Sequence, residues 1–476
     1  MAFSLASFLP EAFQSAVTLA LLLQSLSGSR TLRDDASWIP VAGAMGVGVA
    51  LKSLAASGVM FHGAYQVDAL SQFFKLAVAI GFFIATLNAL RQPTLEKEHR
   101  ADYFMFLSFS ALGLMLLASA VELATVYVAL EISSYALYAV VPLRAKDKRA
   151  AEAGIKYILF GAAATALSLY GLSYVMASQH TTHIAALARL DWSWAANPMA
   201  VVGLTLFLAG MFYKLALFPF HFWAPDVYQG ASNETAAFAA TLPKLGAVAV
   251  LVRLAAVAHA GQELLTVFAV LGAASMTFGN LAALAQRDLK RMLGYSSVAH
   301  AGYVTLGLVA GTKAGLAAAA FYSLVYILMN LTCFWVICRL ADDGRNLAYE
   351  DLDGLYKRSP WLALVLAVAA FALVGLPPTA GFMGKLFLLT AAWNHGFDWL
   401  VVVAALNTAF SIYYYLSMVR HAYTAEVDDP ARLAPAPASG WALLWGAGLA
   451  AVLLALGAVP GPVFDLALRA GAQLLP

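Results

Sequence analysis

Four ionisable residues lie deep inside long apolar segments of this sequence. They are Glu131, Lys214, Lys244 and Lys385, and three of them are amines facing a single carboxylate. Groups of this kind bind and release protons, and burial or a nearby opposite charge changes how tightly a lysine holds its proton. A carboxylate whose distance from a lysine varies could therefore switch that lysine between holding and releasing a proton. The residues predict proton transfer through an apolar interior.

The composition explains why these four residues are exceptional. The chain has 476 residues, of which 62% are hydrophobic and 11% charged, and its net charge is +2. A soluble domain is about 25% charged, so this chain cannot cover several soluble cores with a charged surface. Its hydrophobicity excludes disorder, and it has no basic stripe or motif for nucleic acid. A membrane protein with many spans remains.

The positions of the spans follow from length. A helix needs about 20 apolar residues to cross a hydrocarbon layer of about 30 Å. This rule predicts an all-α polytopic membrane protein with about fourteen transmembrane helices, followed by a short tail, Val463 to Pro476, at the interface. The expected spans are 4–26, 38–58, 69–91, 102–119, 121–142, 154–178, 200–222, 234–258, 262–284, 291–312, 314–339, 360–392, 398–422 and 440–458.

Basic residues are unevenly divided between the two sets of loops. Most of the 28 Lys and Arg fall in alternate loops, including the one between spans nine and ten, whereas the opposite loops hold few. The positive-inside rule then places the basic loops in the cytoplasm and both termini outside it. Lys52, Lys75 and Arg253 lie near span ends, where we expect their charges to snorkel to the interface.

Two of the buried lysines lie beside prolines. Lys214 precedes Pro219, and Lys385 follows Pro377 and Pro378. Proline breaks a helix, and freed carbonyl groups at membrane depth are tolerated only against protein or a water-filled cavity. Broken helices in corresponding positions indicate two inverted repeats. We therefore predict breaks in spans seven and twelve, with spans four to eight and nine to thirteen as the two five-helix halves.

Three further residues are candidates for supporting proton relay: Lys156, His221 and His300. A histidine in a bilayer between lysine-bearing breaks suits such a relay. The structural alternative is that the buried charges form ion pairs that fix helix register. One carboxylate cannot form an ion pair with each of three lysines, however. The sequence has no dinucleotide, phosphate-loop or Fe–S motif, so any redox energy must come from elsewhere.

Three motifs resemble a known family, the antiporter-like subunits of respiratory complex I. They are KLALFPFHFWAPDVYQGA from Lys214 to Ala231, YSSVAHAGY from Tyr295 to Tyr303, and GLPPTAGFMGK from Gly375 to Lys385. The last two are similar to the subunit N branch of bacterial NADH-quinone oxidoreductase. The likeness covers roughly residues 60 to 425.

This resemblance implies specific roles. Glu131 matches the essential carboxylate of helix five, Lys214 the central protonatable site, Lys244 the bridging lysine of helix eight and Lys385 the residue facing the outer exit. Lys156 matches a supporting lysine of helix six. The implied division is 1–100 for helices one to three, 101–260 and 261–425 for the two repeats, and 426–476 for helix fourteen and the tail.

The resemblance also implies the setting. The chain would lie in the bacterial inner membrane with both termini periplasmic, among lipid and neighbouring subunits of the K and M types. FMN, Fe–S clusters and quinone would belong to partner subunits, and this chain would hold no cofactor and not bind NADH directly. The alternatives are a subunit of a multisubunit Na⁺/H⁺ antiporter and a purely structural spacer.

One segment departs from the family pattern. Where the family continues with an apolar, proline-rich stretch, this chain has Ser232-Asn233-Glu234-Thr235. Asn233 is expected to cap the next helix and Glu234 to interact with its positive end. The same carboxylate could instead act near the cytoplasmic side of the proton path.

Overall fold

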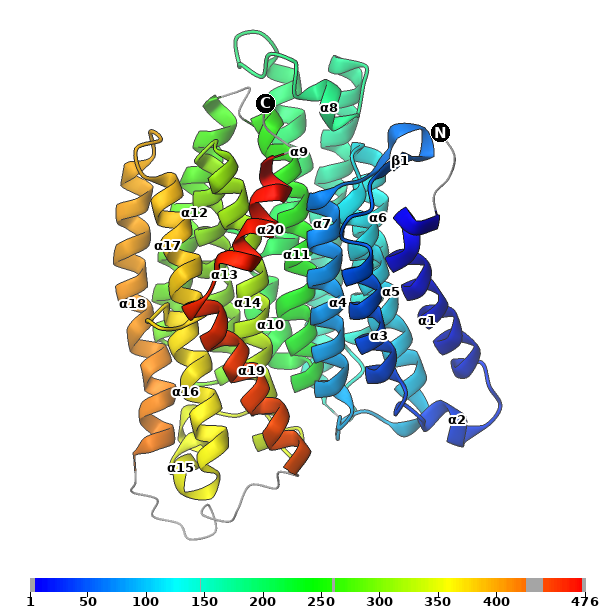
Figure 1. The fold of residues 1–476 in the computed structure, drawn as a ribbon, viewed down its shortest axis with the longest axis vertical. Helices are drawn as coiled ribbons and strands as arrows, with labels where there is room; N and C mark the ends of the chain where they lie inside the picture. The colour runs from blue at the N-terminus through cyan, green and yellow to red at the C-terminus, as the bar shows by residue number, and fades with distance from the viewer. Residues whose placement is uncertain (1–4, 146, 259–261, 425–439, 473–476) are drawn as a thin grey trace.

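The computed structural model describes residues 5–145, 147–258, 262–424 and 440–472. They form a tall bundle of roughly parallel helices (Figure 1). Within these described ranges, ten helices are long and apolar enough to cross a membrane. The described strands form one small hairpin of β1 (Gly58–Met60) and β2 (Tyr65–Val67). The predicted all-α membrane fold is confirmed.

The predicted spans correspond to helices, with small shifts at their ends. The second span ends at Lys52 instead of residue 58, because the chain turns there and enters the β-hairpin. The long helices are α1 (Leu9–Ser25), α3 (Ile39–Lys52), α4 (Ala69–Ala89), α5 (Arg100–Ser119), α6 (Leu123–Val140), α7 (Lys148–Gln179), α9 (Pro198–Leu215), α11 (Asn233–Ala258), α12 (Gln262–Leu284), α13 (Leu289–Val309), α14 (Lys313–Leu340), α16 (Pro360–Val374), α17 (Ala380–Ala392), α18 (Asp398–Tyr423) and α19 (Gly440–Ala458).

Shorter helices connect or extend these. They are α2 (Arg30–Asp34), α8 (Ile184–Leu187), α10 (Trp223–Gly230), α15 (Leu355–Arg358) and α20 (Gly461–Ala472), with 3₁₀ turns η1 (Leu5–Phe8), η2 (Phe61–Gly63), η3 (Lys97–His99) and η4 (Tyr349–Leu352). In Figure 1, α2 and α15 lie at the lower end of the bundle, whereas α8 and the hairpin lie at the upper end. The expected domain boundaries near 260 and 425 fall outside the described residues.

Side-chain caps fix where the adjoining helices begin. Asp68 accepts a hydrogen bond from the Ser71 amide and starts α4 with a capping box. Glu122 accepts from the amides of Ala124 and Thr125 and starts α6 directly after α5 has ended. Such caps satisfy amide groups that have no partner inside the helix. The two spans that almost touch in sequence are therefore separate helices.

The two predicted breaks are present. The α9 helix ends at Leu215, and Ala216 takes a left-handed conformation with φ of 61° before α10 begins. The α16 helix ends at Val374, and Gly375 has φ of 87° before α17 begins. In Figure 1 the chain descends from α9 to α10 but ascends from α16 to α17. Each break leaves helix-terminal carbonyl groups without intrahelical partners inside the bundle.

The C-terminal tail differs from expectation. Residues 461–472 form α20, which runs obliquely along the bundle (Figure 1) and packs against α14 and α4 rather than lying along the interface. The Phe464 ring lies 4.1 Å from that of Phe387, so aromatic packing holds α20 on the bundle. Before it, α19 approaches the second break so closely that a Cβ on Gly457 would be 2.0 Å from the Pro378 carbonyl oxygen.

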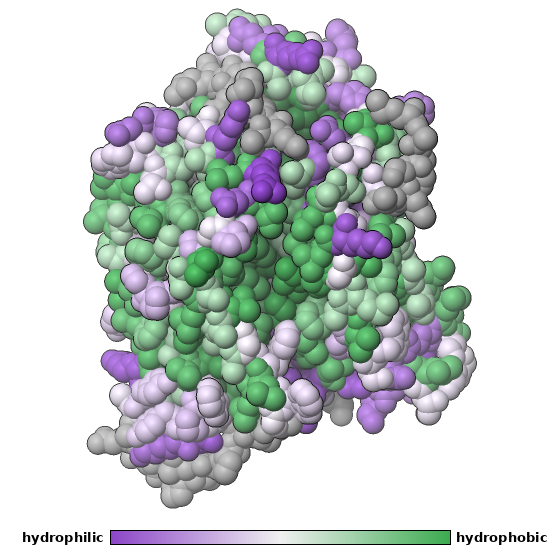
Figure 2. Space-filling model, in the orientation of Figure 1, coloured by the Kyte–Doolittle hydropathy of each residue, from purple (hydrophilic) through white to green (hydrophobic). Residues whose placement is uncertain are grey.

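The surface has an apolar middle. Figure 2 shows hydrophobic side chains over the central height of the bundle and hydrophilic ones gathered toward both ends. Large exposed apolar side chains include Leu159 on α7, Leu406 on α18 and Leu444 on α19. A surface of this kind suits contact with lipid tails and other membrane subunits.

Candidate functional site

Glu131 and Lys214 lie close together on facing helices. Glu131 of α6 is 7% exposed and accepts a hydrogen bond of 2.9 Å from the Thr165 hydroxyl of α7. Lys214 of α9 is fully buried, and its Nζ donates to the Ser134 hydroxyl at 3.1 Å. Ser134 is one turn beyond Glu131, so a hydroxyl group separates the amine from the carboxylate. The charge of the Glu131 carboxylate acts on the Lys214 amine, but the two groups are not in direct contact as an ion pair.

The break positions Lys214. It lies in the last turn of α9, which ends one residue later. The C-terminal end of a helix carries partial negative charge and favours a cation. A protonated lysine in this last turn therefore gains electrostatic support that an unbroken span could not give.

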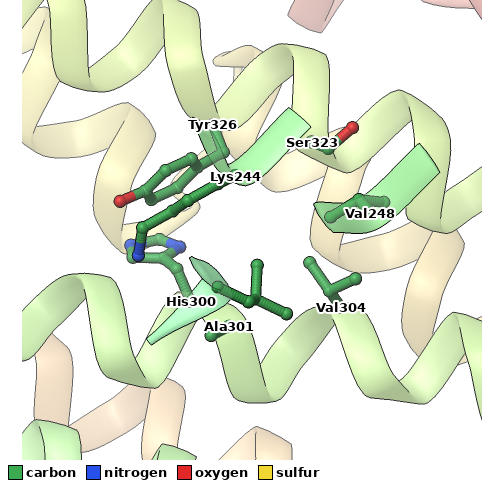
Figure 3. Close-up of a pocket in the computed structure, with 8 residues that line it drawn as sticks. Lys244, Val248, His300, Ala301, Val304, Ser323 and Tyr326 are labelled. Atoms are coloured by element: carbon green, nitrogen blue, oxygen red, sulfur yellow. The ribbon is translucent and has the colours of Figure 1, made fainter. Parts of the chain in front are cut away.

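Lys244 occupies the centre of the bundle. Its Nζ donates to the Ser297 carbonyl oxygen of α13 at 3.1 Å and lies 5.4 Å from the centre of the Tyr326 ring of α14. Figure 3 shows the lysine extending beside that ring toward the His300 imidazole. Lys244, His300 and Leu215 line a cavity of about 10 Å³ at this place. That volume is the smallest that can hold one water molecule.

His300 continues the row from Lys244. Its Nδ1 is 2.6 Å from the Tyr322 hydroxyl, and its Nε2 is 3.1 Å from the Tyr415 hydroxyl. A neutral imidazole donates from one nitrogen and accepts at the other. Because both nitrogens have a hydroxyl partner, His300 can take a proton on one side and release it on the other.

Lys385 lies at the second break. Its Nζ donates to the Val374 carbonyl oxygen at 2.9 Å, at the C-terminal end of α16. The same atom is 4.3 Å from the centre of the Tyr303 ring, whose negative face attracts a cation. Lys385 is 5% exposed. The broken helix thus supplies the carbonyl group that holds the ammonium group.

Five of the predicted residues therefore belong to one assembly. We call Glu131, Lys214, Lys244, His300 and Lys385 the central row. Their side chains come from α6, α9, α11, α13 and α17, so only the tertiary fold brings them together. All five are buried.

Two predicted residues lie apart from this row. Lys156 has a side chain that is 37% exposed, and its Nζ is 2.7 Å from both Glu152 and Asp226. His221 is buried in the first break, with its ring 4.4 Å from that of Phe222 and no hydrogen-bond partner at Nδ1. Lys156 therefore pairs α7 with α10, and His221 packs among aromatic rings.

The expected snorkelling of Lys75 and Arg253 is wrong. Lys75 is fully buried, with its Nζ 2.6 Å from Glu11, and Arg253 is 3% exposed, with Nη1 2.8 Å from Asp68. Each charge has an opposite charge beside it inside the bundle and does not need to reach water. Glu11 at the start of an apolar segment was the available sequence signal. Lys52, by contrast, is exposed.

Sequence reasoning also misplaced residues near the lower end of the bundle. Lys290 was assigned to a basic loop, but it is fully buried and donates to the Ala231 carbonyl oxygen at 2.7 Å. The cap of α11 is Ser232, whose hydroxyl accepts from the Thr235 amide, and not Asn233. Asn233 instead donates to the Arg345 carbonyl oxygen.

Metal binding has no support in the described part of the chain. No group of three or more His, Cys, Asp or Glu side chains there is arranged to hold an ion. The buried groups of the central row are amines, one imidazole and one carboxylate, which suit proton exchange.

Comparison with known proteins identifies the family. Residues 120–411 match the family described as NADH:quinone oxidoreductase/Mrp antiporter, TM. The chain is 61% identical over 473 residues to NADH-quinone oxidoreductase subunit N 2 of Solidesulfovibrio magneticus, covering 99% of this chain and 100% of that protein. The chain belongs to the subunit N family of NADH-quinone oxidoreductases. The protein of the same name from Opitutus terrae is 47% identical, with 91% of each chain covered.

Solved structures support the same family. A chain of respiratory complex I from Thermus thermophilus with bound aureothin is 32% identical, with a TM-score of 0.83 over 96% of this chain and 98% of that chain. A chain of the Mrp complex from Dietzia sp. has a TM-score of 0.85 over 99% of this chain and 98% of that chain, at 20% identity. The second likeness shows the shared fold alone.

Proposed function

We propose that this chain is a proton-translocating membrane-arm subunit of a redox-driven quinone oxidoreductase that takes electrons from NADH or a related donor. Membership of the subunit N family supports the setting. The observation that carries the proposal is the central row: Lys214 meets the Glu131 side through Ser134, and a cavity lined by Leu215, Lys244 and His300 lies between that pair and the part of the row that ends at Lys385. A purely structural core would have no need of three buried lysines of which only Lys214 interacts with the carboxylate of the row.

Proton movement follows from the contacts in the row. When Glu131 approaches Lys214, the ammonium form is stabilised; when it withdraws, the lysine releases its proton toward Lys244. His300 passes the proton between its hydroxyl partners to Lys385, which releases it on the far side. The membrane potential opposes this by about 2.3 kcal/mol per charge per 100 mV. A pKa change of about two units at 1.36 kcal/mol each is of that size.

The setting forms part of the proposal. The loops rich in basic residues would face the cytoplasm and both termini the periplasm, in a bacterial inner membrane. The start of η1 and the end of α20 lie toward the same end of the bundle in Figure 1. This supports an even number of membrane crossings by the chain. Helices before α5, the two inverted five-helix repeats, and α19 with α20 would be the structural divisions.

The partners also belong to the proposal. Subunits of the K and M types and lipid would contact the apolar sides, while FMN, Fe–S clusters and quinone would be held by partner subunits. This chain would contribute no redox step and no NADH contact. Lys156 would support the path by holding Asp226, and His221 by lining the first break.

The alternative is a subunit of a multisubunit Na⁺/H⁺ antiporter. The likeness to the Mrp complex concerns the fold alone, whereas the curated relatives at 61% and 47% identity are oxidoreductase subunits. The redox-driven function is therefore favoured.

Substitution of the lysines tests the proposal. In inverted membrane vesicles that hold the assembled complex, Lys214→Ala and Lys385→Ala should reduce proton uptake driven by NADH by about tenfold or more, which corresponds to about 1.4 kcal/mol in the barrier. Lys97→Ala, at a side chain that is 79% exposed, is the matched control and should pump normally. Normal pumping in both row variants would refute the mechanism. A requirement for Na⁺ instead of NADH would favour the antiporter.

A further inference from the structure

Glu234 is a buried carboxylate outside the central row. It lies in the first turn of α11 and is 3% exposed. Among the described residues, neither of its side-chain oxygen atoms has a hydrogen-bond partner. It does not cap the helix, because Ser232 does so. A buried acid without such partners is costly, and structural use of the helix end does not require it.

The charges of several basic groups act on this carboxylate. The charges of Lys290, Arg144 and Arg339 all interact with Glu234, and Cys338 also lies beside it. In the described part of the chain, Lys290 donates to the Ala231 carbonyl oxygen, and Arg144 donates to carbonyl oxygens that include that of Gly230. The nearby amine on Lys290 can therefore exchange a proton with the carboxyl group, whereas the guanidinium groups stay charged.

A cavity connects the surface with the cluster formed by Glu234, Lys290, Arg144, Arg339 and Cys338. It has a volume of about 310 Å³ and is lined by residues that include Arg91, Gln92, Cys338 and Arg339. Arg91 is exposed, whereas Gln92 is 2% exposed and donates to the Ser232 hydroxyl at 2.8 Å. The cavity has room for several waters. Gln92 thus connects the lining of the cavity with Ser232, two residues before Glu234.

A second set of groups leads from the cluster to the central row. Lys290 is seven residues before Ser297 on α13, a rise of about 10 Å. The Ser297 carbonyl oxygen accepts the hydrogen bond from Lys244, and its hydroxyl lies 3.3 Å from that of Tyr228. Glu234 and Lys244 belong to the same helix, about 15 Å apart along its axis. The cluster therefore lies between the cavity and the middle of the row.

We propose that Glu234 takes up protons from the cavity beside Gln92 and passes them through Lys290 to Lys244. In the first step, a hydronium ion in the cavity gives a proton to the carboxylate. In the second, the carboxyl O–H bond breaks and an N–H bond forms on neutral Lys290. This assignment rests on the proposed function, because the cavity is an inlet only if the row carries protons.

The test compares two substitutions of Glu234 in the assembled complex, in vesicles with NADH as donor. Glu234→Gln should lower proton pumping and quinone reduction together by about tenfold, or about 1.4 kcal/mol in the barrier. The loss should be larger at pH 8 than at pH 6, because proton uptake limits turnover when protons are scarce. Glu234→Asp should restore most of the rate. Glu350→Gln, at an exposed carboxylate, is the matched control.

The outcomes separate this inference from the proposed function. Glu234→Gln with normal pumping beside an inactive Lys385→Ala overturns the inlet and leaves the row intact. Normal pumping in both variants overturns both. If Glu234→Gln does not assemble, Gln92→Leu decides, since it keeps Glu234 but blocks the cavity side. Slower pumping in Gln92→Leu supports the inlet, and an unchanged rate overturns it.

Discussion

The buried pair of Asp68 and Arg253 offers a quantitative test of how the N-terminal helices are held. Arg253 of α11 donates to both carboxylate oxygens of Asp68, at 2.8 and 2.9 Å, and also to the Ala118 carbonyl oxygen. Asp68 at the same time caps α4. The pair thus joins the start of α4 to α11. We consider Asp68→Ser, which keeps a capping hydroxyl but removes the charge.

The expected loss follows from burial. Arg253 is 3% exposed and cannot reach water when its partner is removed. Removing one member of a buried ion pair destabilises a protein by about 3–5 kcal/mol, because the other charge stays uncompensated. Replacing both members by residues that fit the space is often nearly neutral. Asp68→Ser should therefore lower the free energy of unfolding by about 3–5 kcal/mol, and adding Arg253→Met should recover most of it.

The assay is reversible unfolding of the purified chain in mixed micelles with increasing SDS. Glu98→Gln, which removes the exposed pair with Arg30, should change the free energy by less than about 1 kcal/mol. A single-variant loss below about 1 kcal/mol would refute the argument, as would a double variant no more stable than Asp68→Ser.

The same pair predicts a pH dependence. Burial acts to raise the pKa of Asp68, but the charge and hydrogen bonds of Arg253 outweigh it and hold the pKa below its usual 3.8. The folded-state pKa is thus lower than the unfolded one, so the stabilisation is present above about pH 4 and disappears as the pH falls through the folded value. The stability difference between wild type and Asp68→Ser should shrink in that acidic range.

Three further predictions concern packing and the proton path. Gly381→Ala should prevent normal assembly of the complex, measured by native gel. The reason is that the new Cβ would lie 1.7 Å from the Ala372 carbonyl oxygen. Normal assembly of this variant would show that α16 can shift. Tyr322→Phe removes one hydroxyl partner of His300. In the vesicle assay it should slow proton pumping by about tenfold, which corresponds to about 1.4 kcal/mol in the barrier. An unchanged rate would exclude that hydroxyl from the path. Lys156→Met should slow pumping by only about two- to threefold, since the amine is part-exposed and acts by holding Asp226; a complete loss would place it in the path.

Much of the fold could be predicted from the sequence, because the bilayer limits the alternatives. A spanning segment must be long, apolar and helical, so length and hydrophobicity locate it. The two breaks were predictable because proline cannot continue a helix. The second span was predicted to end six residues too late, since hydropathy does not detect a turn such as the one that follows Lys52.

The charges show where sequence reasoning stops. Glu131, Lys214, Lys244 and Lys385 were identifiable because a charge in an apolar segment needs a reason. Lys290 was not, because it stands next to loop residues and only the packing of α13 against Ala231 buries it. A basic residue near a span end looks the same in sequence whether it reaches water or meets an acid.

The sequence by itself determined the apolar helices, their breaks and the ionisable residues that must be explained, since these depend on local chemistry and on distance along the chain. Only the tertiary structure decided the partners: that Lys75 meets Glu11, and that the carboxylate of Glu234 interacts with the charge of Lys290. The physical reason is that an ion pair or a proton step depends on a few ångströms between side chains of different helices. Those distances are fixed by how the helices pack, which hydropathy does not encode.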